Sequence, residues 1–334
     1  MTWVLKTAQA SLSLFTKKSD MSTILITGGT GLIGAALSKE LLASGHQLII
    51  LTRGTKTSLQ AGLRYAAWDP AKGEIDLEAV LEADYIIHLA GAGVAEKRWS
   101  KKRKQEILDS RVESGKLLVK TLTTHPNKVK ALVSSSAIGY YGADPVIPNP
   151  RPFTEDDPAS DDFLGKTCVA WEKSLDGLDG LHGTAIRVVK FRTGIVLANE
   201  GGALREFAKP LRFGLATILG SGRQVISWIH IGDMVRLYIN AVSDPSVTGV
   251  FNAVAPKPVS NKELVLKLAK LERKNSFIPI HVPSFALRLA MGEMSTEVLK
   301  SSTVSCDKLH IAGFNFLYPS IDAALENLVS QHNP

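Results

Sequence analysis

Three glycines near the start of the chain are spaced for binding a phosphate group. They are Gly28, Gly31 and Gly34, within the string TGGTGLIG at 27–34. Glycines at this spacing let the backbone turn tightly and approach a pyrophosphate, whose negative charge then meets the N-terminus of the next helix. The string follows an apolar run at 24–27 and opens a helical pattern at 37–43. This context predicts a dinucleotide site that includes Gly28, Thr30, Gly31, Leu32 and Ile33.

The residue after the second apolar run indicates which dinucleotide binds. An NAD site usually places an acid about 20 residues after the glycines to hold the ribose hydroxyls, whereas an NADP site has a cation for the 2′-phosphate. No acid occurs between Glu40 and Asp69, and Arg53 follows Thr52 at the end of the apolar run. The pattern therefore predicts NADP(H), with Thr52 and Arg53 at the adenine ribose. Asp69 has two interpretations, an adenine contact or the start of a turn at Pro70.

Further motifs follow the glycine string in order along the chain. They are 88–91 (HLAG), 134–136 (SSS), 140–142 (YYG), 171–172 (WE), 192–197 (RTGIVL) and 227–233 (SWIHIGD). Together with the glycine string they resemble the epimerase family protein group, also called SulA-like or YfcH-like, of the extended short-chain dehydrogenase/reductases. The resemblance runs from about residue 23 to residue 328. Its C-terminal part, at 283–294 and 308–316, is similar to the terminal domain of that group.

The resemblance implies hydride transfer at a nicotinamide, with a Tyr-x-x-x-Lys pair and a serine that handle the proton. A cation one helical turn away lowers the pKa of such a tyrosine toward the working pH. This chain departs from the pattern, because none of its 6 tyrosines has a lysine four residues later. Counted back from Trp171, the two positions fall on Leu164 and Cys168, which form an apolar helical stripe with Trp171 and Leu175. The usual proton relay is therefore not expected.

Ser136 and Tyr141 are the candidate catalytic residues that remain. Ser136 matches the serine position of the superfamily at the end of a strand, and Tyr141 in the next turn brings a phenol near the same pocket. The adjacent Tyr140 is interpreted as the packing residue of the pair, although the sequence does not decide between them. His88 and His230 are interpreted as hydrogen-bonded core or turn histidines rather than catalysts.

The resemblance also implies further contacts with the cofactor. A backbone of small residues passes the ribose and pyrophosphate at the end of the fourth strand, here Leu89, Ala90 and Gly91. Arg111 takes the place of the superfamily's helix asparagine, where a cation would meet a phosphate. Glu106, slightly more than one helical turn earlier, either orients Arg111 or a ribose, or is a solvated acid in a basic helix. Val196 follows the strand that passes the nicotinamide and is expected to supply backbone contacts.

Short apolar runs alternate with helical patterns in the first 200 residues. Runs of strand length occur at 24–27, 48–52, 85–89, 129–134 and 184–189, and helical patterns occur at 37–43, 101–123 and from about 162. Strands that alternate with helices are typical of βαβ units and a parallel sheet. The sequence therefore predicts an α/β fold, with a Rossmann-type doubly wound parallel sheet over 21–200. A later strand near 230–254 is expected to return to this sheet.

The rest of the chain is predicted to form smaller parts around the sheet. Residues 201–334 are interpreted as a mixed substrate or lid region, which includes a family-specific C-terminal domain at about 280–330. Helical patterns in it occur at 262–271, 285–290 and 321–329. Residues 143–162, with five prolines and six acids, are predicted to be a surface loop. Residues 1–20 are predicted to be a loose tail.

Composition excludes several classes of protein. The 334 residues are 45% hydrophobic and 21% charged, an ordinary globular balance. No apolar run reaches the roughly 18 residues of a membrane span. The 2 cysteines lie far apart without a Cys/His cluster, so neither a metal site nor a disulfide framework is indicated.

The positive charge of the chain is local. Residues 97–104 carry six basic side chains and no acid, so subtracting them from the net charge of +7 leaves +1. A general nucleic-acid surface is therefore not expected. Segment 97–104 is interpreted either as a solvated helix start or as a rim that attracts a phosphorylated or nucleotide-linked substrate.

Taken together, these patterns predict an NADP(H)-binding oxidoreductase or epimerase-like protein that acts on a small molecule. The alternative is a cofactor-dependent binding or regulatory protein with reduced chemistry. We expect no metal, no nucleic-acid or membrane partner, and a monomer or homodimer. The expected location is cytoplasmic, or an organelle if residues 1–20 act as a targeting tail.

Overall fold

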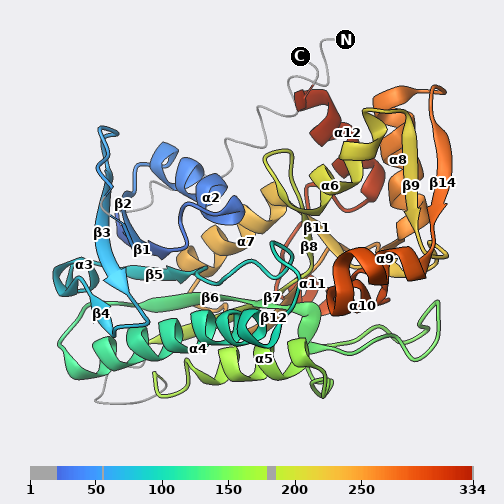
Figure 1. Ribbon diagram of the computed structural model, residues 1–334. Coiled ribbons are helices and arrows are strands. Elements are labelled where there is room, and N and C mark those ends of the chain that lie inside the picture. Colours follow the sequence, from blue (N-terminus) through green and yellow to red (C-terminus); the bar gives the residue numbers. More distant parts are fainter. Residues whose placement is uncertain (1–20, 55, 179–185, 333–334) are drawn as a thin grey trace, which may run out of the picture.

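An eight-stranded sheet forms the centre of the computed structural model, which describes residues 21–54, 56–178 and 186–332 (Figure 1). Its strand order is β12-β7-β6-β5-β1-β2-β3-β4, and every neighbouring pair is parallel except β3 with β4. The strands are β1 (Thr23–Thr27), β2 (Gln47–Thr52), β3 (Leu63–Asp69), β4 (Glu74–Ile75), β5 (Tyr85–His88), β6 (Ala131–Ala137), β7 (Arg187–Thr193) and β12 (Gly249–Ala253). The predicted α/β class with a doubly wound sheet is confirmed, and the order reverses between β1 and β5.

Helices cover both faces of this sheet. One face carries α2 (Leu32–Ala43) and α7 (Ile231–Ser243), and the other carries α3 (Leu77–Leu81), α4 (Lys101–Thr124) and α5 (Phe163–Lys173) (Figure 1). The central strands are apolar throughout because both of their faces are buried, as in other parallel sheets. Ile24 and Leu25, for example, point into opposite cores and are each 0% exposed.

Two strands are displaced from their predicted ranges. The strand predicted at 129–134 is β6, which continues to Ala137 because its ladder with β7 continues to Thr193. The strand predicted at 184–189 appears as β7, and its expected start lies outside the described residues. The predicted tail, 1–20, also lies outside them.

Apart from α7 and β12, most of the chain after residue 194 packs as a smaller unit beside the sheet (Figure 1). A third core joins α6, α8 and α12, whereas β12 belongs to the central sheet. The three helices predicted at 262–271, 285–290 and 321–329 are confirmed as α8, α9 and α12. The elements of this part are β8 (Ile195–Leu197), α6 (Gly202–Leu211), β9 (Leu215–Leu219), β10 (Val225–Ile226), β11 (Trp228–His230), β13 (Val259–Ser260), α8 (Asn261–Arg273), β14 (Ile278–Val282), α9 (Ser284–Met291), α10 (Ser295–Leu299), α11 (Asp307–Ile311) and α12 (Ile321–His332).

The sequence predicted a surface loop at 143–162, but part of this proline-rich loop is buried. Asp144 is only 9% exposed, and its carboxylate accepts four hydrogen bonds. The donors are Asn149 Nδ2 (3.1 Å), Ser301 Oγ (2.7 Å), Thr303 N (2.9 Å) and Thr303 Oγ1 (2.8 Å). Because three of these four bonds come from residues 301 and 303, the loop is anchored to the C-terminal part of the chain. None of the helices in the described ranges is both long and apolar enough to cross a membrane.

Candidate functional site

The glycine turn joins β1 to α2, and steric contacts require glycine at two of its positions. A Cβ on Gly34 would lie 2.4 Å from the Gly28 oxygen and 2.6 Å from the Gly29 Cα. Gly28 has a φ of +68°, and a Cβ there would lie 2.8 Å from the carbonyl carbon of Leu89. These neighbours are backbone atoms, which cannot move aside as a flexible side chain can. The glycine turn therefore packs its backbone directly against neighbouring backbone, and it leaves no side chain between this backbone and a phosphate group.

The N-terminus of α2 is open to an anion. Gly31 is its N-cap, so no side chain caps the helix, and its first turn holds no acid. Thr30 and Gly31 are exposed at the tip of the turn, and Leu32 and Ile33 begin the helix. The first backbone N–H groups of a helix have no partner within it, and the helix dipole favours negative charge there. The predicted residues thus form a site suited to a pyrophosphate.

A buried hydroxyl connects this turn to the end of β5. Thr27 Oγ1 accepts hydrogen bonds from the backbone N–H groups of Leu89 and Ala90, each at 3.1 Å. It also bonds to His88 Nδ1 at 2.7 Å, while His88 Nε2 lies 3.2 Å from Ser114 Oγ. His88 is 0% exposed, and burial, with a smaller effect of a nearby arginine, lowers its pKa to about 4. The interpretation of His88 as a core histidine is confirmed.

His230 is likewise a turn residue and not an exposed base. Its Nδ1 accepts the backbone N–H of Gly232 at 3.0 Å, which caps α7. The side chain is 4% exposed, and burial lowers its pKa to about 4.

The two buried histidines predict that stability falls in mild acid. Their folded pKa of about 4 lies below the unfolded value of 6.5, so the unfolded chain binds more protons between these pH values. The stabilisation is complete above pH 6.5 and is lost as the pH falls toward 4, on the order of 3 kcal/mol per histidine. Urea unfolding across this range should show the slope. His230→Asn, which keeps a capping side chain, should reduce the slope, and exposed His125→Asn should not; equal slopes in all three proteins would contradict the prediction.

Arg53 stands exposed at the end of β2, beside partly buried Thr52. The pKa of Glu106 is lowered mainly by its hydrogen bond with Arg103, and to a smaller extent by the charges of Lys97 and Arg53. Glu106 is therefore close enough to Arg53 to feel its charge. Arg53 itself forms no ion pair with any other residue in the described parts of the chain. This leaves a free cation at the position predicted for the 2′-phosphate.

Asp69, at the end of β3, serves its own turn. Its Oδ1 accepts the backbone N–H of Ala71 at 3.1 Å, and its Oδ2 lies 3.5 Å from Lys72 Nζ. The contacts of Asp69 therefore support its interpretation as the residue that starts the turn at Pro70.

Glu106 and Arg111 do not pair with each other. Glu106 Oε1 lies 2.8 Å from Arg103 Nη1, so its partner is the cation three residues earlier. Arg111 Nη1 donates instead to the backbone oxygens of Ala92 at 3.0 Å and Ile107 at 2.9 Å. The Arg111 guanidinium carbon also lies 3.1 Å from where a Cβ on Gly91 would stand. The interpretation that Glu106 orients Arg111 is therefore wrong, and Arg111 supports the loop after β5.

Val196 lies in β8, a strand that pairs with β11 beyond the end of β7. Its backbone oxygen lies 3.4 Å from where a Cβ on Gly202, at the start of α6, would stand. The same Cβ would lie 3.2 Å from Leu32 Cδ2 at the start of α2. The starts of α2 and α6 therefore meet beside Val196.

The positions of the absent Tyr-x-x-x-Lys pair lie on α5, as the sequence predicts. Cys168 is 3% exposed, and its Sγ is 3.6 Å from the Ala137 oxygen at the end of β6. Burial, and then the charge of Glu172, raises the pKa of the Cys168 thiol to about 12. Leu164 is partly buried and lies 3.3 Å from where a Cβ on Gly139 would stand. Towards the end of β6 and the turn after it, this part of α5 therefore carries a hydrocarbon side chain and a protonated thiol in place of the tyrosine and lysine.

The two candidate catalytic residues are both engaged inside the protein. Ser136 is 2% exposed, and its Oγ donates to Glu172 Oε1 at 2.7 Å. Tyr141 is 0% exposed; its hydroxyl donates to Asn252 Oδ1 at 2.8 Å and accepts from Arg192 Nη1 at 2.9 Å. Burial raises the pKa of Tyr141 to about 12.

The interpretation of Tyr140 as the packing residue of the pair is wrong, because Tyr141 is the more deeply buried of the two. Tyr141 is the packing residue, stacked on Phe153 with ring centroids 5.3 Å apart. Tyr140 is only partly buried, and the guanidinium carbon of Arg192 lies 3.4 Å from its ring centroid. The reason is that both partners of the Tyr141 hydroxyl, Asn252 on β12 and Arg192 on β7, lie far along the chain.

No role was predicted for Glu172 or Arg192, which form a buried ion pair. Two hydrogen bonds join them, Nε to Oε1 at 2.9 Å and Nη2 to Oε2 at 3.0 Å, and their side chains are 11% and 5% exposed. Burial opposes the charge of Arg192, but the bonds and charge of Glu172 outweigh it and raise the pKa of the guanidinium. The WE and RTGIVL motifs contain both residues and were the signal that could have identified them.

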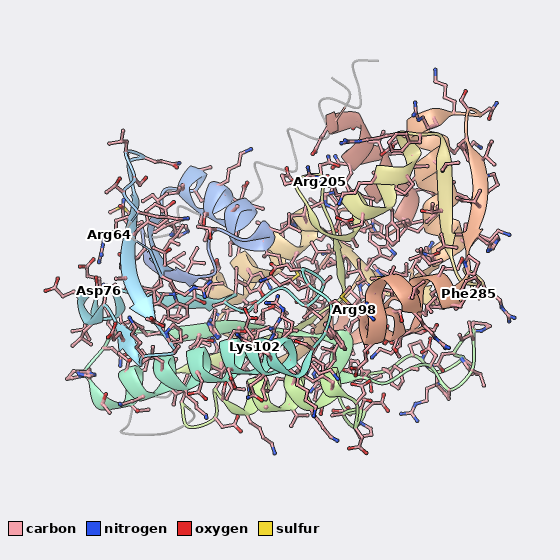
Figure 2. All side chains as sticks on the ribbon, in the orientation of Figure 1. Arg64, Asp76, Arg98, Lys102, Arg205 and Phe285 are labelled. Atoms are coloured by element: carbon pink, nitrogen blue, oxygen red, sulfur yellow. The ribbon has the colours of Figure 1, made fainter. Side chains whose placement is uncertain are left out.

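Segment 97–104 is divided between solvent and internal contacts. Arg103 is 5% exposed and pairs with Glu96 and Glu106, whereas Lys101 and Lys102 are exposed at the start of α4. Lys104 pairs with Glu293 in the C-terminal region. Figure 2 shows Arg98 between the start of α4 and the helices of that region, where its Nη1 lies 3.5 Å from the Leu289 oxygen. The segment is thus partly a solvated helix start and partly a contact between α4 and the C-terminal region.

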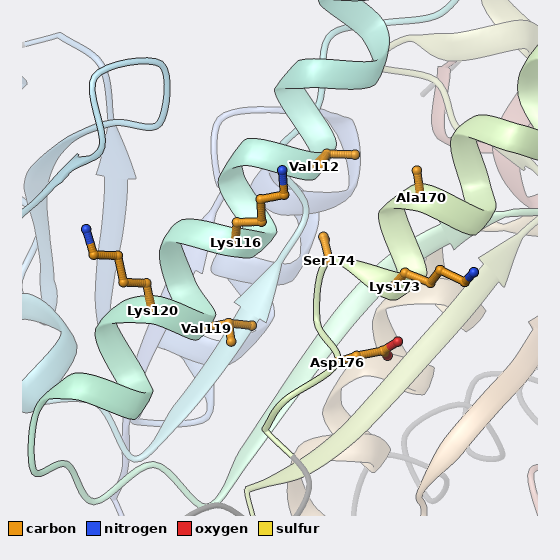
Figure 3. Close-up of a pocket in the computed structure, with 8 residues that line it drawn as sticks. All are labelled: Val112, Lys116, Val119, Lys120, Ala170, Lys173, Ser174 and Asp176. Atoms are coloured by element: carbon orange, nitrogen blue, oxygen red, sulfur yellow. The ribbon is translucent and has the colours of Figure 1, made fainter.

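A pocket of about 520 Å³ lies between α4 and α5, apart from the glycine turn (Figure 3). Its lining is Val112, Lys116, Val119, Lys120, Ala170, Lys173, Ser174 and Asp176. The lysine side chains in Figure 3 extend along the helix surfaces. No group of three or more His, Cys, Asp or Glu side chains that could hold a metal occurs in the described parts of the chain.

Sequence comparison relates both ends of the chain to known families. Residues 24–166 match the NAD dependent epimerase/dehydratase family, and residues 282–328 match a domain of unknown function, DUF1731. An epimerase family protein of Staphylococcus saprophyticus is 39% identical over 92% of this chain and 100% of its own length. The epimerase family protein YfhF of Bacillus subtilis is 33% identical over 92% of this chain and 98% of its own.

Solved structures are similar over the same extent. The crystal structure of the human epimerase family protein SDR39U1 (isoform2) with NADPH is 30% identical, with a TM-score of 0.79, and the match covers 92% of this chain and 99% of that one. A nucleoside-diphosphate sugar epimerase from Corynebacterium glutamicum is 29% identical, with a TM-score of 0.73, over 96% of this chain and 61% of that one. The likeness thus includes both the central sheet and the region beside it.

Proposed function

Since this chain belongs to the epimerase family proteins, which carry an NAD-dependent epimerase/dehydratase region, we propose that it is an NADP(H)-dependent oxidoreductase or epimerase-like enzyme. Its substrate is a small molecule, and nucleotide-linked compounds are the first class to test. The protein works as a monomer or homodimer in a reducing compartment such as the cytoplasm. The two free, buried cysteines, Cys168 and Cys306, are consistent with that location.

The observation that carries the proposal is Arg53 next to the glycine turn. The turn and the uncapped start of α2 suit a pyrophosphate, and Arg53 is a free cation one strand away. A guanidinium binds phosphate through charge-assisted hydrogen bonds, which an NAD ribose does not offer. The NADPH in the human relative's structure supports the same choice of cofactor.

The chemistry that the cofactor supplies is hydride transfer to or from a carbon of the substrate. The proton that accompanies it has to be moved by a group other than a Tyr-x-x-x-Lys pair. Ser136, at the serine position that the resemblance implies, is the candidate for this step, and its hydroxyl donates to Glu172.

A second candidate function is a cofactor-dependent binding or regulatory protein. It is favoured by Leu164 and Cys168, which replace the proton-relay pair, and by the internal hydrogen bonds of Ser136 and Tyr141. Hydride transfer with NADPH and any member of a carbonyl and nucleotide-sugar panel would exclude it. An inactive panel combined with tight NADPH binding would favour it over the enzyme.

Calorimetric titration with NADPH, NADP⁺, NADH and NAD⁺ tests the proposal directly. The parent protein should prefer the two phosphorylated forms, and Arg53→Ala should weaken NADPH binding by roughly 10- to 100-fold without changing NADH binding. Arg64 lies on β3, the strand next to β2, and pairs at the surface with Glu82 at the end of α3. Arg64→Ala is the matched control and should bind as the parent does. Failure to bind any dinucleotide, or an unchanged preference in Arg53→Ala, would contradict the proposal.

A further inference from the structure

Three side chains from different elements meet in a buried cluster near the ends of β6 and β7. Ser136 and Arg192 lie opposite each other in the parallel ladder of these strands, and Glu172 comes from α5. Glu172 Oε1 accepts hydrogen bonds from Ser136 Oγ at 2.7 Å and from Arg192 Nε at 2.9 Å. Its Oε2 accepts from Arg192 Nη2 at 3.0 Å. Glu172 is thus the anionic half of an ion pair, and both of its oxygens act as acceptors.

Ser136 alone cannot be the final acceptor of a proton. A serine hydroxyl that takes up a proton from a substrate has to release its own hydrogen, because a hydroxyl is a very weak base. Glu172 is the only hydrogen-bond partner of Ser136 Oγ in the part of the chain that the structure describes. The hydrogen of Ser136 therefore already points at a carboxylate oxygen, at a distance over which a base takes a proton.

Two other titratable groups beside the cluster do not compete for this proton. Cys168, one turn earlier on α5, remains a protonated thiol, because burial and then the charge of Glu172 raise its pKa to about 12. The Tyr141 hydroxyl bonds to two other side chains and not to Ser136. Among the described residues, Glu172 is therefore the acceptor that is connected to Ser136.

The position of Ser136 in the sheet faces the expected substrate. In a doubly wound sheet the ligand binds outside the carboxyl ends of the strands, and Ser136 is the second-to-last residue of β6. Ser136 is 2% exposed, but its chain neighbours Ser135 and Ala137 are partly exposed, so this end of β6 reaches the surface. The side chain of Glu172 is 11% exposed. Ser136 and Glu172 thus form a path from the edge of the sheet to an acceptor that is largely shielded from water.

We propose that Glu172 is the proton acceptor of the reaction and that Ser136 passes the proton to it. The inference rests on the proposed function and names the substrate as an alcohol, whose hydroxyl donates a hydrogen bond to Ser136 Oγ. As a hydride leaves the substrate carbon for NADP⁺, the O–H proton of the substrate moves to Ser136 Oγ, and the hydrogen of Ser136 moves to Glu172 Oε1. The products are a carbonyl compound, NADPH and a protonated Glu172, which returns its proton to water. Arg192 is a positioning residue that holds the carboxylate in place.

The first experiment measures turnover by the whole protein. Cyclohexanol, UDP-glucose, UDP-N-acetylglucosamine and UDP-glucuronic acid would each be combined with NADP⁺, and the absorbance of the reduced cofactor followed. The parent protein should oxidise at least one of these alcohols. Glu172→Gln should lower kcat roughly 100- to 10,000-fold and leave the calorimetric affinity for NADP⁺ unchanged within about twofold. Glu113→Gln, which replaces an exposed acid paired with Lys116, is the matched control and should behave as the parent does.

Small anions distinguish a proton acceptor from a charge that only supports the structure. Glu172→Ala leaves the Arg192 guanidinium without its carboxylate, and formate and nitrate are both planar anions that suit this fork. Formate takes up a proton, whereas nitrate is a far weaker base. Formate should therefore raise the kcat of Glu172→Ala at least about 10-fold, and nitrate should not. Neither anion should raise the kcat of Ser136→Ala, in which the path is broken one step earlier.

Thermal melting shows whether each variant is folded. A low kcat in folded Glu172→Gln with parent-like NADP⁺ binding, together with rescue of Glu172→Ala by formate alone, supports the inference. If Glu172→Ala does not fold, Glu172→Gln carries the test. The inference is overturned, while the proposed function stands, by a parent-like kcat in folded Glu172→Gln, by equal rescue with both anions or by no rescue of folded Glu172→Ala. A parent protein that reduces carbonyl compounds with NADPH but oxidises no alcohol overturns it as well. A parent protein that converts neither alcohols nor carbonyl compounds overturns the proposed function itself.

Discussion

Gly34→Ala should weaken NADPH binding by at least about 100-fold, because the added methyl group cannot fit without moving backbone atoms. The Cβ would lie 2.4 Å from the Gly28 oxygen and 2.6 Å from the Gly29 Cα. Relief of these contacts pushes the glycine turn away from the start of α2, and the backbone N–H groups then no longer converge on the pyrophosphate. Calorimetric titration with NADPH measures the loss, and urea unfolding measures the accompanying loss of stability.

Gly45→Ala is the matched control for this variant. Gly45 follows the other end of α2 with a φ of +86°, and nothing lies within 4 Å of a Cβ there. The substitution should therefore cost about 1 kcal/mol of stability through backbone strain alone and leave the NADPH affinity unchanged. If Gly34→Ala binds NADPH as tightly as Gly45→Ala does, the glycine turn does not hold the cofactor.

Arg192→Met should lower the free energy of unfolding by about 3–5 kcal/mol. The substitution leaves the Glu172 carboxylate buried without its cation and removes the hydrogen bond that Arg192 donates to the Tyr141 hydroxyl. The remaining bond from Ser136 Oγ to Glu172 cannot offset the buried charge, because one neutral donor is weaker than a paired guanidinium. Urea unfolding of the variant and the parent protein measures the difference.

The double variant Arg192→Met/Glu172→Met should be more stable than Arg192→Met alone. Removing both charges abolishes the unpaired carboxylate, and replacing a buried ion pair by apolar groups is often close to neutral. Arg64→Met breaks an exposed pair with Glu82 and should cost less than about 1 kcal/mol. An Arg192→Met variant as stable as Arg64→Met would show that the buried pair contributes little.

The sheet could be predicted from sequence because its strands are buried on both faces. Continuous apolar runs such as 24–27 and 48–52 have no other stable place in a globular chain. The extension of β6 beyond Ser134, through Ser135 and Ser136 to Ala137, could not be predicted in this way, because the two serines are polar. These serines are tolerated there since the ladder with β7 and hydrogen bonds to neighbours satisfy them.

The candidate site was predictable where its contacts are local. The glycine turn depends on residues within one short string. The pairing of Glu106 with Arg103 is also local, at a spacing of three residues that is common on helices, although Arg111 was the partner expected from the sequence. The roles of Ser136 and Tyr141 depend on partners 36 and 111 residues away, Glu172 and Asn252. No local pattern reveals such partners, so the sequence did not identify Tyr141 as the packing residue.

The four hydrogen bonds that converge on Asp144 have a consequence for the order in which the protein folds during synthesis. Ser301 and Thr303 supply three of the four hydrogen bonds to this buried carboxylate, so its burial lacks most of its donors until they are in place. The ribosome makes these donors about 160 residues after Asp144, at a rate of roughly 5–20 residues per second. The loop 143–162 and the tyrosines before it therefore reach their final arrangement only when almost the whole chain has emerged. A nascent chain halted before residue 301 is expected to hold a formed glycine turn beside a loop 143–162 that is not yet anchored.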